Sequence, residues 1–458
     1  MSQQSLEQLL KTTRSPVELL RNSQIGPYAF PVVPSEFTNW RDEQRSWRET
    51  AALFDQSHHM TDLYITGPDG LRLLSDLGVN SLKGFAVNKG KQFVACNHDG
   101  YVIGDAILFY LDDESFSLVG RPPALNWVQF NAETGGYDVR VERDERSAVN
   151  KGERRTYRYQ VQGPRALEVM EQATGGKVPE IRFFNMDELV IAGCKVRALR
   201  HGMVGMPGFE LFGPWADGAR VKAALVEAGR KFGLRQVGAR TYPTSTLESG
   251  WIPSPLPAIY TGKQLQGYRE WLPSNWYEGM ASLGGSFDSD NIEDYYLTPY
   301  DLGYGSFVRF DHDFIGRAAL EQLAASSPRQ KITLAWNGED VTRAFATMFA
   351  PGEKTKYIDL PLANYATLSY DRILSGGKLV GLSMYTGYSA NESSMLSLSV
   401  IDAACSEPGT EVTLVWGEAD GGSSKPTVEP HRQTEIRATV GPVPYADLAR
   451  TAYRPTGT

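Results

Sequence analysis

The sequence predicts an α+β protein with a mixed helix-and-strand region over residues 1–325 and a separate all-β domain over residues 326–458. In the first region strand-like and helix-like stretches alternate, and the order strand, Gly-Pro, helix occurs twice, at residues 63–77 and 157–172. Beyond residue 325 strand-like stretches alternate with turn clusters, which is typical of a sandwich or barrel. Glycine (45 residues) and proline (26 residues) together exceed the roughly 55 expected from average usage, which indicates many tight turns.

The mixed region begins with helices. Residues 5–22 predict two short amphipathic helices interrupted at Pro16, because proline cannot donate the hydrogen bond that a helix interior needs. Residues 26–34 predict an extended stretch. Apolar residues at helical spacing predict helices and alternating ones predict strands: helices at 40–51, 68–77, 123–134, 164–172 and 217–232, and strands at 60–66, 91–120 (a meander), 157–161 and 189–199 (a pair).

The all-β domain is predicted from six strand-like stretches. Turn clusters such as Ser375-Gly376-Gly377 and Asp420-Gly421-Gly422 separate them, and the domain boundary is expected at residues 324–329. The stretches are 331–337, 356–365, 378–389, 395–402, 410–417 and 433–440.

Composition argues against several classes of protein. The net charge of −8 is unlike that of a nucleic-acid binder, which needs a basic face to displace counterions from phosphates. No stretch approaches the roughly 18 apolar residues of a membrane span, and the first residues lack the apolar core of a signal peptide. Three widely spaced cysteines predict no disulfide framework, so a cytoplasmic location is expected, and no obligate protein partner is evident.

The motifs of common metal and nucleotide chemistry are absent from the sequence. There is no HExxH and no paired CxxC, so no metal site is expected. Gly202, Gly205 and Gly208 have the spacing GxxGxxG, but strands flank them on both sides, which argues against a dinucleotide-binding turn.

Four motifs, in order along the chain, resemble the aminomethyltransferase (glycine-cleavage T-protein) family: GYVIGD at 100–105, RHGMVGMPGFE at 200–210, and the segments 237–250 and 300–317. The resemblance spans about residues 40–455. It implies a three-lobed folate-binding fold, with two intertwined α/β lobes in residues 1–325 and a C-terminal β-barrel. Met206 stands where the family signature has a glutamate, which argues against glycine-cleavage activity.

Within this family the chain looks most similar to the tetrahydrofolate-dependent aryl O-demethylases of vanillate, 3-O-methylgallate and syringate. The similarity is near-verbatim in FDQSHHM (54–60), in VGR (119–121) and in parts of 240–255. It implies transfer of a methyl group from a methoxylated hydroxybenzoate to N5 of tetrahydrofolate as co-substrate. Phe30 stands where we expect tyrosine in the vanillate enzyme, so the preferred acid stays open.

Tyr242 is the candidate catalytic residue. An aryl methyl ether is inert because phenoxide leaves poorly, so the departing oxygen needs a proton. Tyrosine, with a pKa of about 10, is protonated at neutral pH and is matched to a phenolic oxygen. From the residues alone, a buried tyrosine whose hydroxyl satisfies a loop is the commoner case; the resemblance favours the proton donor.

Arg121 is the candidate for the carboxylate of the aromatic acid, because its planar fork suits bidentate pairing. Neighbouring residues of an extended segment face opposite sides, so only one of His58 and His59 is expected to face the site. The resemblance favours His59, acting with Gln56 on the oxygens of the ring. Aromatic walls are expected from Tyr28 and Phe30.

Glu210 and Arg240 resemble the folate-binding residues of the family. A carboxylate can accept two hydrogen bonds from the donor edge of a pterin, which suits Glu210, and Arg240 is expected at an acceptor edge or at the folate tail. Asp105 resembles an acid that lies near the folate nitrogens, and Trp251 is expected to add an aromatic wall.

Two other functions stay open from the sequence. One is an aminomethyltransferase or another folate-dependent demethylase with a non-aromatic methyl donor, such as a sulfonium or tertiary amine. The other is a non-catalytic folate-binding protein of the same fold. A panel of methyl donors with and without tetrahydrofolate separates the three.

Overall fold

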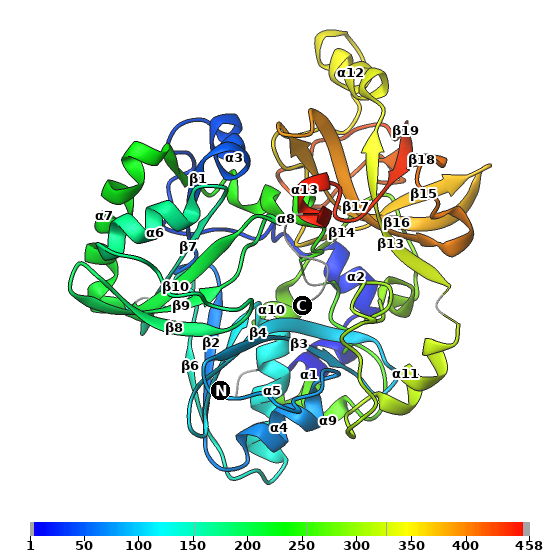
Figure 1. The fold of residues 1–458 in the computed structure, drawn as a ribbon. Helices are drawn as coiled ribbons and strands as arrows, with labels where there is room; N and C mark the ends of the chain where they lie inside the picture. Colours follow the sequence, from blue (N-terminus) through cyan, green and yellow to red (C-terminus); the bar gives the residue numbers. More distant parts are fainter. Residues whose placement is uncertain (1–3, 151, 254, 327, 452–458) are drawn as a thin grey trace.

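A computed structural model describes residues 4–150, 152–253, 255–326 and 328–451. Three lobes surround a common centre: two contain an open sheet with helices, and the third is a closed barrel (Figure 1). This architecture confirms the predicted α+β class and the C-terminal barrel.

The first lobe is built on a six-stranded sheet with the order β11-β1-β7-β10-β9-β8. Helices α6 (Ala166–Thr174) and α7 (Gly218–Gly229) bury one face of it (Figure 1). Cross-strand pairing aligns Phe54, Gln160 and Glu210 in one row on the other face. The strands are β1 (Ala51–Asp55), β7 (Thr156–Gln162), β8 (Met186–Ile191), β9 (Cys194–Arg200), β10 (Gly208–Pro214) and β11 (Leu234–Val237).

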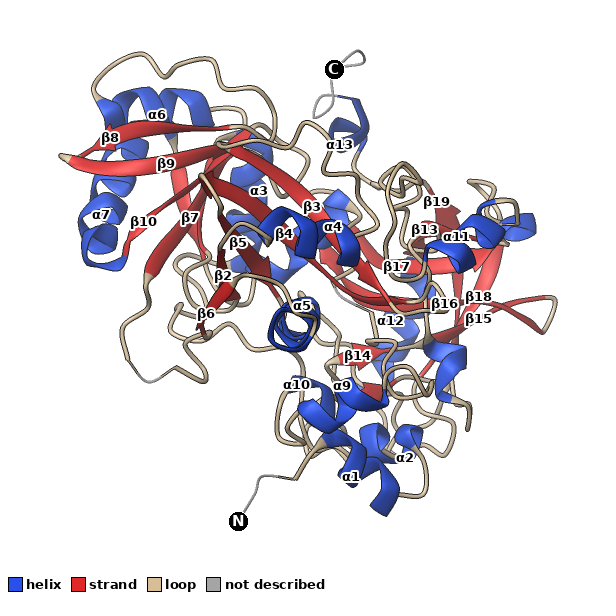
Figure 2. Cartoon of the chain, turned by 90° about the horizontal axis from the view of Figure 1, so that it is seen from below, coloured by secondary structure: helices blue, strands red, loops and turns tan. Residues whose placement is uncertain are grey.

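The second lobe holds a five-stranded sheet with the order β3-β4-β5-β2-β6. Helix α5 (Pro122–Thr134) packs on it, and helices α1, α2, α9 and α10 gather at one end of the molecule (Figure 2). The two sheets meet through the apolar side chains of Phe109, Val119, Leu199 and Phe212. The elements are β2 (Thr61–Thr66), β3 (Lys89–Cys96), β4 (Val102–Asp112), β5 (Ser115–Gly120), β6 (Arg140–Asp144), α1 (Leu6–Thr12), α2 (Pro16–Arg21), α4 (Gly70–Leu77), α9 (Gln266–Trp271), α10 (Tyr277–Met280) and α11 (Arg317–Ala324).

The barrel closes because β13 pairs with both β17 and β19. Trp336 and Trp416 pack edge to face in its core. Its six strands are β13 (Arg329–Trp336), β15 (Asp371–Ser375), β16 (Lys378–Ser389), β17 (Ser394–Asp402), β18 (Glu411–Trp416) and β19 (Thr434–Gly441); β12 (Leu283–Gly284) and β14 (Leu368–Ser369) form a separate pair, and α12 (Gly338–Ala346) projects outward (Figure 1).

After the barrel the chain returns to the first lobe. Helix α13 (Asp447–Thr451) places the Cβ and Cα atoms of Ala449 against Gly205, so closely that a side chain at position 205 would collide with them. Helix α3 (Trp40–Glu49) also joins the lobes, since Gln44 donates to Thr244 and to the carbonyl of Tyr388 in the barrel.

Two sequence-based predictions of secondary structure differ from the structure. Residues 356–365 were expected to form a strand but are irregular apart from one bridge at Leu362, because Pro361 cannot donate to a ladder. Residues 40–51 were expected to be helical throughout, whereas β1 begins at Ala51. All five residues of β1 are buried, so this strand lacks the alternation by which strands are recognised.

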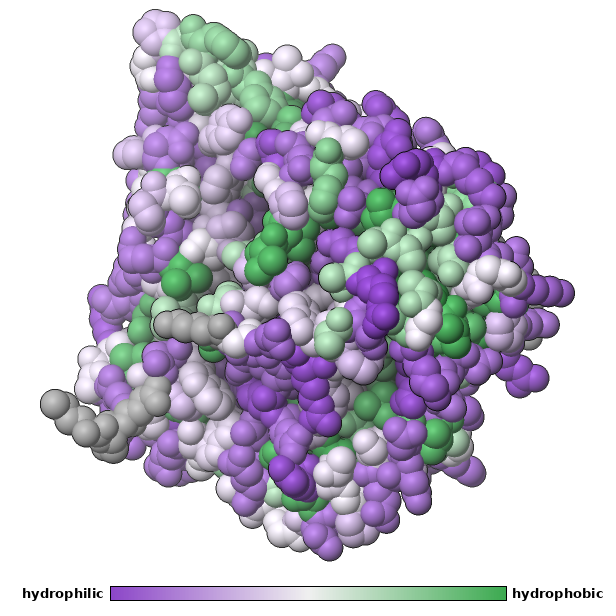
Figure 3. Space-filling view, turned by 90° about the vertical axis from the view of Figure 1, so that its left-hand side faces the viewer, coloured by the Kyte–Doolittle hydropathy of each residue, from purple (hydrophilic) through white to green (hydrophobic). Residues whose placement is uncertain are grey.

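The surface on the side of the first lobe is mainly hydrophilic, with apolar residues in separate patches (Figure 3). Every helix in the described ranges falls short of the length and apolar character that crossing a bilayer requires. Within the same ranges, no three side chains among His, Cys, Asp and Glu gather closely enough to hold a metal ion.

Candidate functional site

The chain crosses from the first sheet to the second over residues 56–60, between the end of β1 and the start of β2. This crossover carries Gln56 and His59, whose residues are 4% and 7% exposed. The start of β2 pairs with Gly120 at the end of β5, and Gly120 pairs in turn with Ala106 of β4. The ladder therefore brings the crossover, Arg121 and Asp105 to one place at the junction of the two sheets.

Tyr242 is positioned by the loop that follows β11. The carboxylate of Glu43 in α3 accepts hydrogen bonds from the backbone N–H of Gly238 (2.9 Å) and from the hydroxyl of Thr241 (2.6 Å). Gly238 passes so close to the carbonyl of Ser35 that no Cβ atom would fit. The ring of Tyr242 consequently packs edge to face on Phe54, with 5.3 Å between centroids.

Three rings meet at the crossover. The centroid of Tyr242 lies 4.7 Å from that of His59 and 4.8 Å from that of Phe30, and Phe30 lies 4.5 Å from His59. The hydroxyl of Tyr28 donates to the backbone carbonyl of His59. His58 points elsewhere, with Nδ1 2.9 Å from the Ser147 hydroxyl. Of the two histidines, His59 is the one that contacts Tyr242.

The burial of these rings fixes their protonation. Burial raises the pKa of the Tyr242 phenol well above its ordinary value, and the amide of Gln56 partly offsets this. The Tyr242 oxygen lies 3.5 Å from the sulfur of Met203, which is a weak acceptor. Burial, reinforced by the charge of Arg121, lowers the pKa of His59 to about 3. At neutral pH the site therefore presents a protonated phenol beside a neutral imidazole.

Arg121 lies with its guanidinium carbon 4.5 Å from the ring centroid of Tyr28 and donates to the carbonyl of Pro253 (3.3 Å). Arg146 lies 4.9 Å from the same ring centroid. Neither arginine forms an ion pair with a carboxylate in the described part of the chain. The hydroxyl of Tyr277 is buried and has no hydrogen-bond partner there. Burial raises the pKa of Tyr277, and the nearby charge of Arg121 opposes this. Two cations and one unsatisfied hydroxyl thus lie where an anionic substrate could be bound.

Glu210 lies on the face of the first sheet opposite α6 and α7 and is 5% exposed. Its Oε1 atom accepts a hydrogen bond from Arg158 Nη1 at 2.6 Å. Gln160 pairs with Glu210 across the strands, and Gln162 follows on the same face. Within the described ranges, Gln160 Oε1, Gln162 Nε2 and Gln56 Oε1 are buried without a hydrogen-bond partner. This face thus offers a carboxylate, two acceptors and one donor.

Asp105 and Trp251 contact each other, but Arg240 lies apart from Glu210. Asp105 Oδ2 accepts hydrogen bonds from Trp251 Nε1 (3.0 Å) and from the hydroxyl of Tyr304 (2.9 Å). Arg240 has a side chain that is 43% exposed, and it contacts Glu36 and the carbonyl of Leu360. The structure shows no hydrogen bond or ion pair between Arg240 and Glu210 among the described residues.

Two cavities of about 380 and 490 Å³ lie beside the interface of the sheets, with Tyr64 in the lining of both. Arg158 lines the first and Arg154 the second. None of the predicted site residues lines either cavity. Phe30 instead packs directly on both His59 and Tyr242.

Comparison with known proteins places this arrangement in a family. The model of the GCVT N-terminal domain matches residues 23–254. The chain belongs to the GCVT family. It is 50% identical over 450 residues to a syringate O-demethylase from Sphingobium sp. strain SYK-6, with 98% of this chain and 97% of that protein covered. It is 32% identical over 439 residues to a sesamin methylene transferase from Sinomonas sp., with 92% of each chain covered.

A solved structure supports the fold. The glycine cleavage system aminomethyltransferase T from Bartonella henselae superposes with a TM-score of 0.61 at 18% identity, and 92% of each chain is covered. The predicted family and the expectation of an enzyme are confirmed by these matches. The sequence analysis did not single out several residues described above as site residues: Arg146, Arg158 and Tyr277, and Met203 and Tyr304, which lie within the family motifs.

Proposed function

We propose that the chain is a tetrahydrofolate-dependent O-demethylase of a methoxylated hydroxybenzoate of the syringate type, acting in the cytoplasm. The observation that carries the proposal is one continuous line of contacts, from the protonated phenol of Tyr242 through His59 and Tyr28 to the guanidinium of Arg121. It joins a proton donor to an anion site across an aromatic cluster in which His59 and Tyr242 are buried and Tyr28 and Phe30 are half-buried. The 50% identity to a syringate O-demethylase supports the same function.

On the substrate side, Arg121 would bind the carboxylate of the aromatic acid, and the Tyr277 hydroxyl would donate a further hydrogen bond. Neutral His59 and the Gln56 amide would bind the ring oxygens. Phe30 packs on both His59 and Tyr242, so its ring would border a substrate bound beside them. Adding a hydroxyl at position 30, as in Phe30→Tyr, would then alter which ring substituents fit.

The residues on the cofactor side fit a reduced pterin. A pterin edge carries both donors and acceptors, and the unsatisfied groups of Gln160 and Gln162 beside the Glu210 carboxylate are complementary to them. Glu210 would accept the donor edge, with Asp105 and Trp251 at the neighbouring sheet. Tetrahydrofolate, when bound, supplies the nitrogen nucleophile N5 that accepts the methyl group.

Tyr242 would complete the reaction by proton transfer. As the bond between the methyl carbon and the ring oxygen breaks, the phenol of Tyr242 gives its proton to that oxygen. The amide of Gln56 then stabilises the tyrosinate. The phenol would be restored by the proton that N5 of a bound tetrahydrofolate loses in exchange for the methyl group, so the reaction would consume no net proton.

The test is turnover of syringate by the purified chain with and without tetrahydrofolate. We expect one methylated folate per methyl group removed from the acid, measured by chromatography with mass detection, and no product without tetrahydrofolate. The methyl ester of syringate is the matched control, because it lacks the charge that Arg121 would bind. Turnover of a sulfonium or tertiary amine in place of syringate, or tight folate binding without turnover of any donor, would contradict the proposal.

A further inference from the structure

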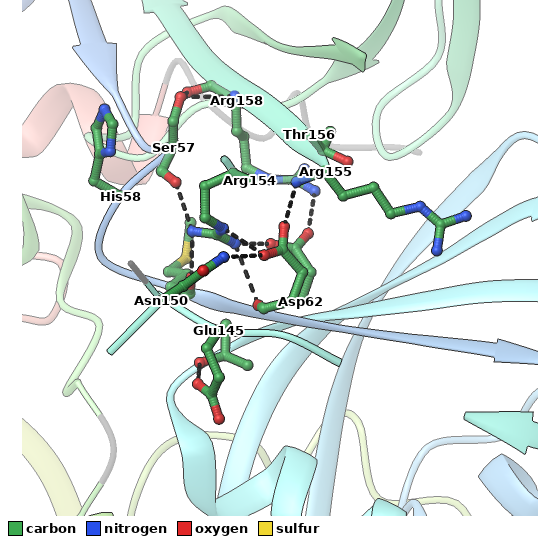
Figure 4. Close-up of polar contacts among 12 residues, drawn as sticks. Ser57, His58, Asp62, Glu145, Asn150, Arg154, Arg155, Thr156 and Arg158 are labelled. Carbon is green, nitrogen blue, oxygen red and sulfur yellow. Dashed lines mark hydrogen bonds and ion pairs between the residues drawn. The ribbon is translucent and has the colours of Figure 1, made fainter. Parts of the chain in front are cut away.

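A buried chain of charged side chains connects the two open sheets. Arg154 Nη2 donates to Asp62 Oδ2 (2.8 Å), and Arg158 Nη2 donates to Asp62 Oδ1 (3.1 Å). The side chains are 2%, 5% and 6% exposed for Arg154, Arg158 and Asp62. Figure 4 shows the two guanidinium groups converging on this carboxylate. We refer to Arg154, Asp62 and Arg158 as the charge bridge.

One end of the charge bridge reaches the cofactor side through Glu210. Arg158 Nη1 donates to Glu210 Oε1 at 2.6 Å. The Arg158 guanidinium carbon also lies 4.9 Å from the ring centroid of Phe109 in the second sheet and 4.7 Å from that of Phe212 in the first. Although burial disfavours its charge, the carboxylates of Asp62 and Glu210 raise the pKa of Arg158, which stays cationic. Arg158 therefore holds Glu210 by its Oε1 atom and remains charged while it does so.

The other end reaches the substrate side through the crossover. Arg154 Nη1 donates to the backbone carbonyls of Ser57 (2.6 Å) and Met60 (3.1 Å), which stand on either side of the two histidines. Arg154 Nε lies 2.9 Å from Asp144 Oδ1 at the end of β6. One guanidinium thus fixes the turn that carries His59 to the second sheet.

We propose that the charge bridge positions the substrate half and the cofactor half of the site relative to each other. Arg154 acts on the crossover, Arg158 acts on Glu210, and Asp62 joins them. All three are positioning residues, because each works through another residue. The inference rests on the proposed function, since in-line methyl transfer requires the donor carbon and the acceptor nitrogen to be held at a fixed distance.

The experiment compares R158K, R154K and D62N with the wild type, measuring kcat and both KM values with syringate and tetrahydrofolate. Lysine keeps the charge but cannot bind two carboxylates in a fork. We expect R158K to raise KM for tetrahydrofolate roughly tenfold and to leave KM for syringate unchanged, and R154K to do the reverse. We expect D62N to lower kcat about 100-fold with smaller changes in either KM. R155K is the control: the Arg155 side chain is 56% exposed and pairs with Glu142.

Three outcomes overturn the inference. One is a lower melting temperature and a smaller fraction of active enzyme in the variants, with both KM values of the folded enzyme unchanged. A purely structural role predicts this result. Another is a rise of the same KM in R158K and R154K. The third is failure of the wild type to convert syringate with tetrahydrofolate, which overturns the proposed function as well. This outcome is distinguished from the other two because it is measured on the wild type and not on a variant. Should D62N not fold, the comparison of the two lysine variants still decides.

Discussion

Replacing Tyr242 by phenylalanine removes one oxygen atom from the buried ring cluster and leaves its packing in place. The Tyr242 hydroxyl lies 3.5 Å from the Met203 sulfur, a weaker interaction than the ordinary hydrogen bond worth about 1 kcal/mol. We therefore expect the free energy of unfolding to fall by less than about 1 kcal/mol. Loss of general acid catalysis lowers kcat by about 10²–10⁴-fold, which corresponds to roughly 3–5 kcal/mol of activation free energy.

The assay is single-turnover methyl transfer, with KM for the acid and the melting temperature measured alongside. A series of aryl methyl ethers that release increasingly acidic phenols makes the assay more specific. A better leaving group depends less on being protonated. The deficit of Tyr242→Phe should shrink along that series, while KM stays close to that of the wild type. A variant with full activity, or a deficit that is constant along the series, would refute the role of Tyr242 as proton donor.

Four further outcomes are expected. Arg121→Ala should raise KM for syringate roughly 10–100-fold and leave turnover of its methyl ester unchanged; equal effects on both substrates would contradict carboxylate binding. Glu210→Gln should raise KM for tetrahydrofolate alone and lower the free energy of unfolding by about 1–3 kcal/mol, measured by denaturant titration, because Arg158 loses a charged partner; an unchanged KM would exclude a role in cofactor binding. Because the folded His59 has a pKa of about 3 against an ordinary 6.5, the unfolded chain binds the extra proton, so stability should fall as pH drops below 6.5, by about 2 kcal/mol at pH 5. His59→Gln should have a flatter stability curve, and an equal slope would refute this. Phe30→Tyr should change the ratio of kcat/KM values among vanillate, 3-O-methylgallate and syringate, and an unchanged ratio would remove Phe30 from the determinants of specificity.

Local patterns in the sequence were sufficient for elements whose burial alternates or repeats with helical period, such as β2 and α4. They failed at β1, which is buried on both faces, and at residues 356–365, where Pro361 interrupts an otherwise strand-like pattern. The division of the chain at residues 325 and 326 stays a prediction.

The candidate site was predicted only where the family motifs extend, and the roles of its residues stay predictions. These motifs identified Tyr242, His59 and Arg121, and the structure places the three in one line of contacts. Arg154 and Arg158 both donate hydrogen bonds to Asp62, which lies 92 and 96 residues earlier in the chain. No local spacing encodes such a pairing. Conversely, the motif that suggested Arg240 does not include Glu36. The ion pair with Glu36 holds the half-exposed Arg240 side chain away from Glu210.

The seating of Ala449 on Gly205 ties the barrel to the chemistry of the first lobe. Gly205 belongs to the loop that carries Met203, and Met203 touches both Gln56 (2.7 Å) and the Tyr242 hydroxyl. A displacement of the barrel that carried α13 with it would therefore lift Ala449 from this loop and loosen the packing around Tyr242. The position of the barrel and the position of the Tyr242 side chain are in this way coupled through Gly205 and Met203.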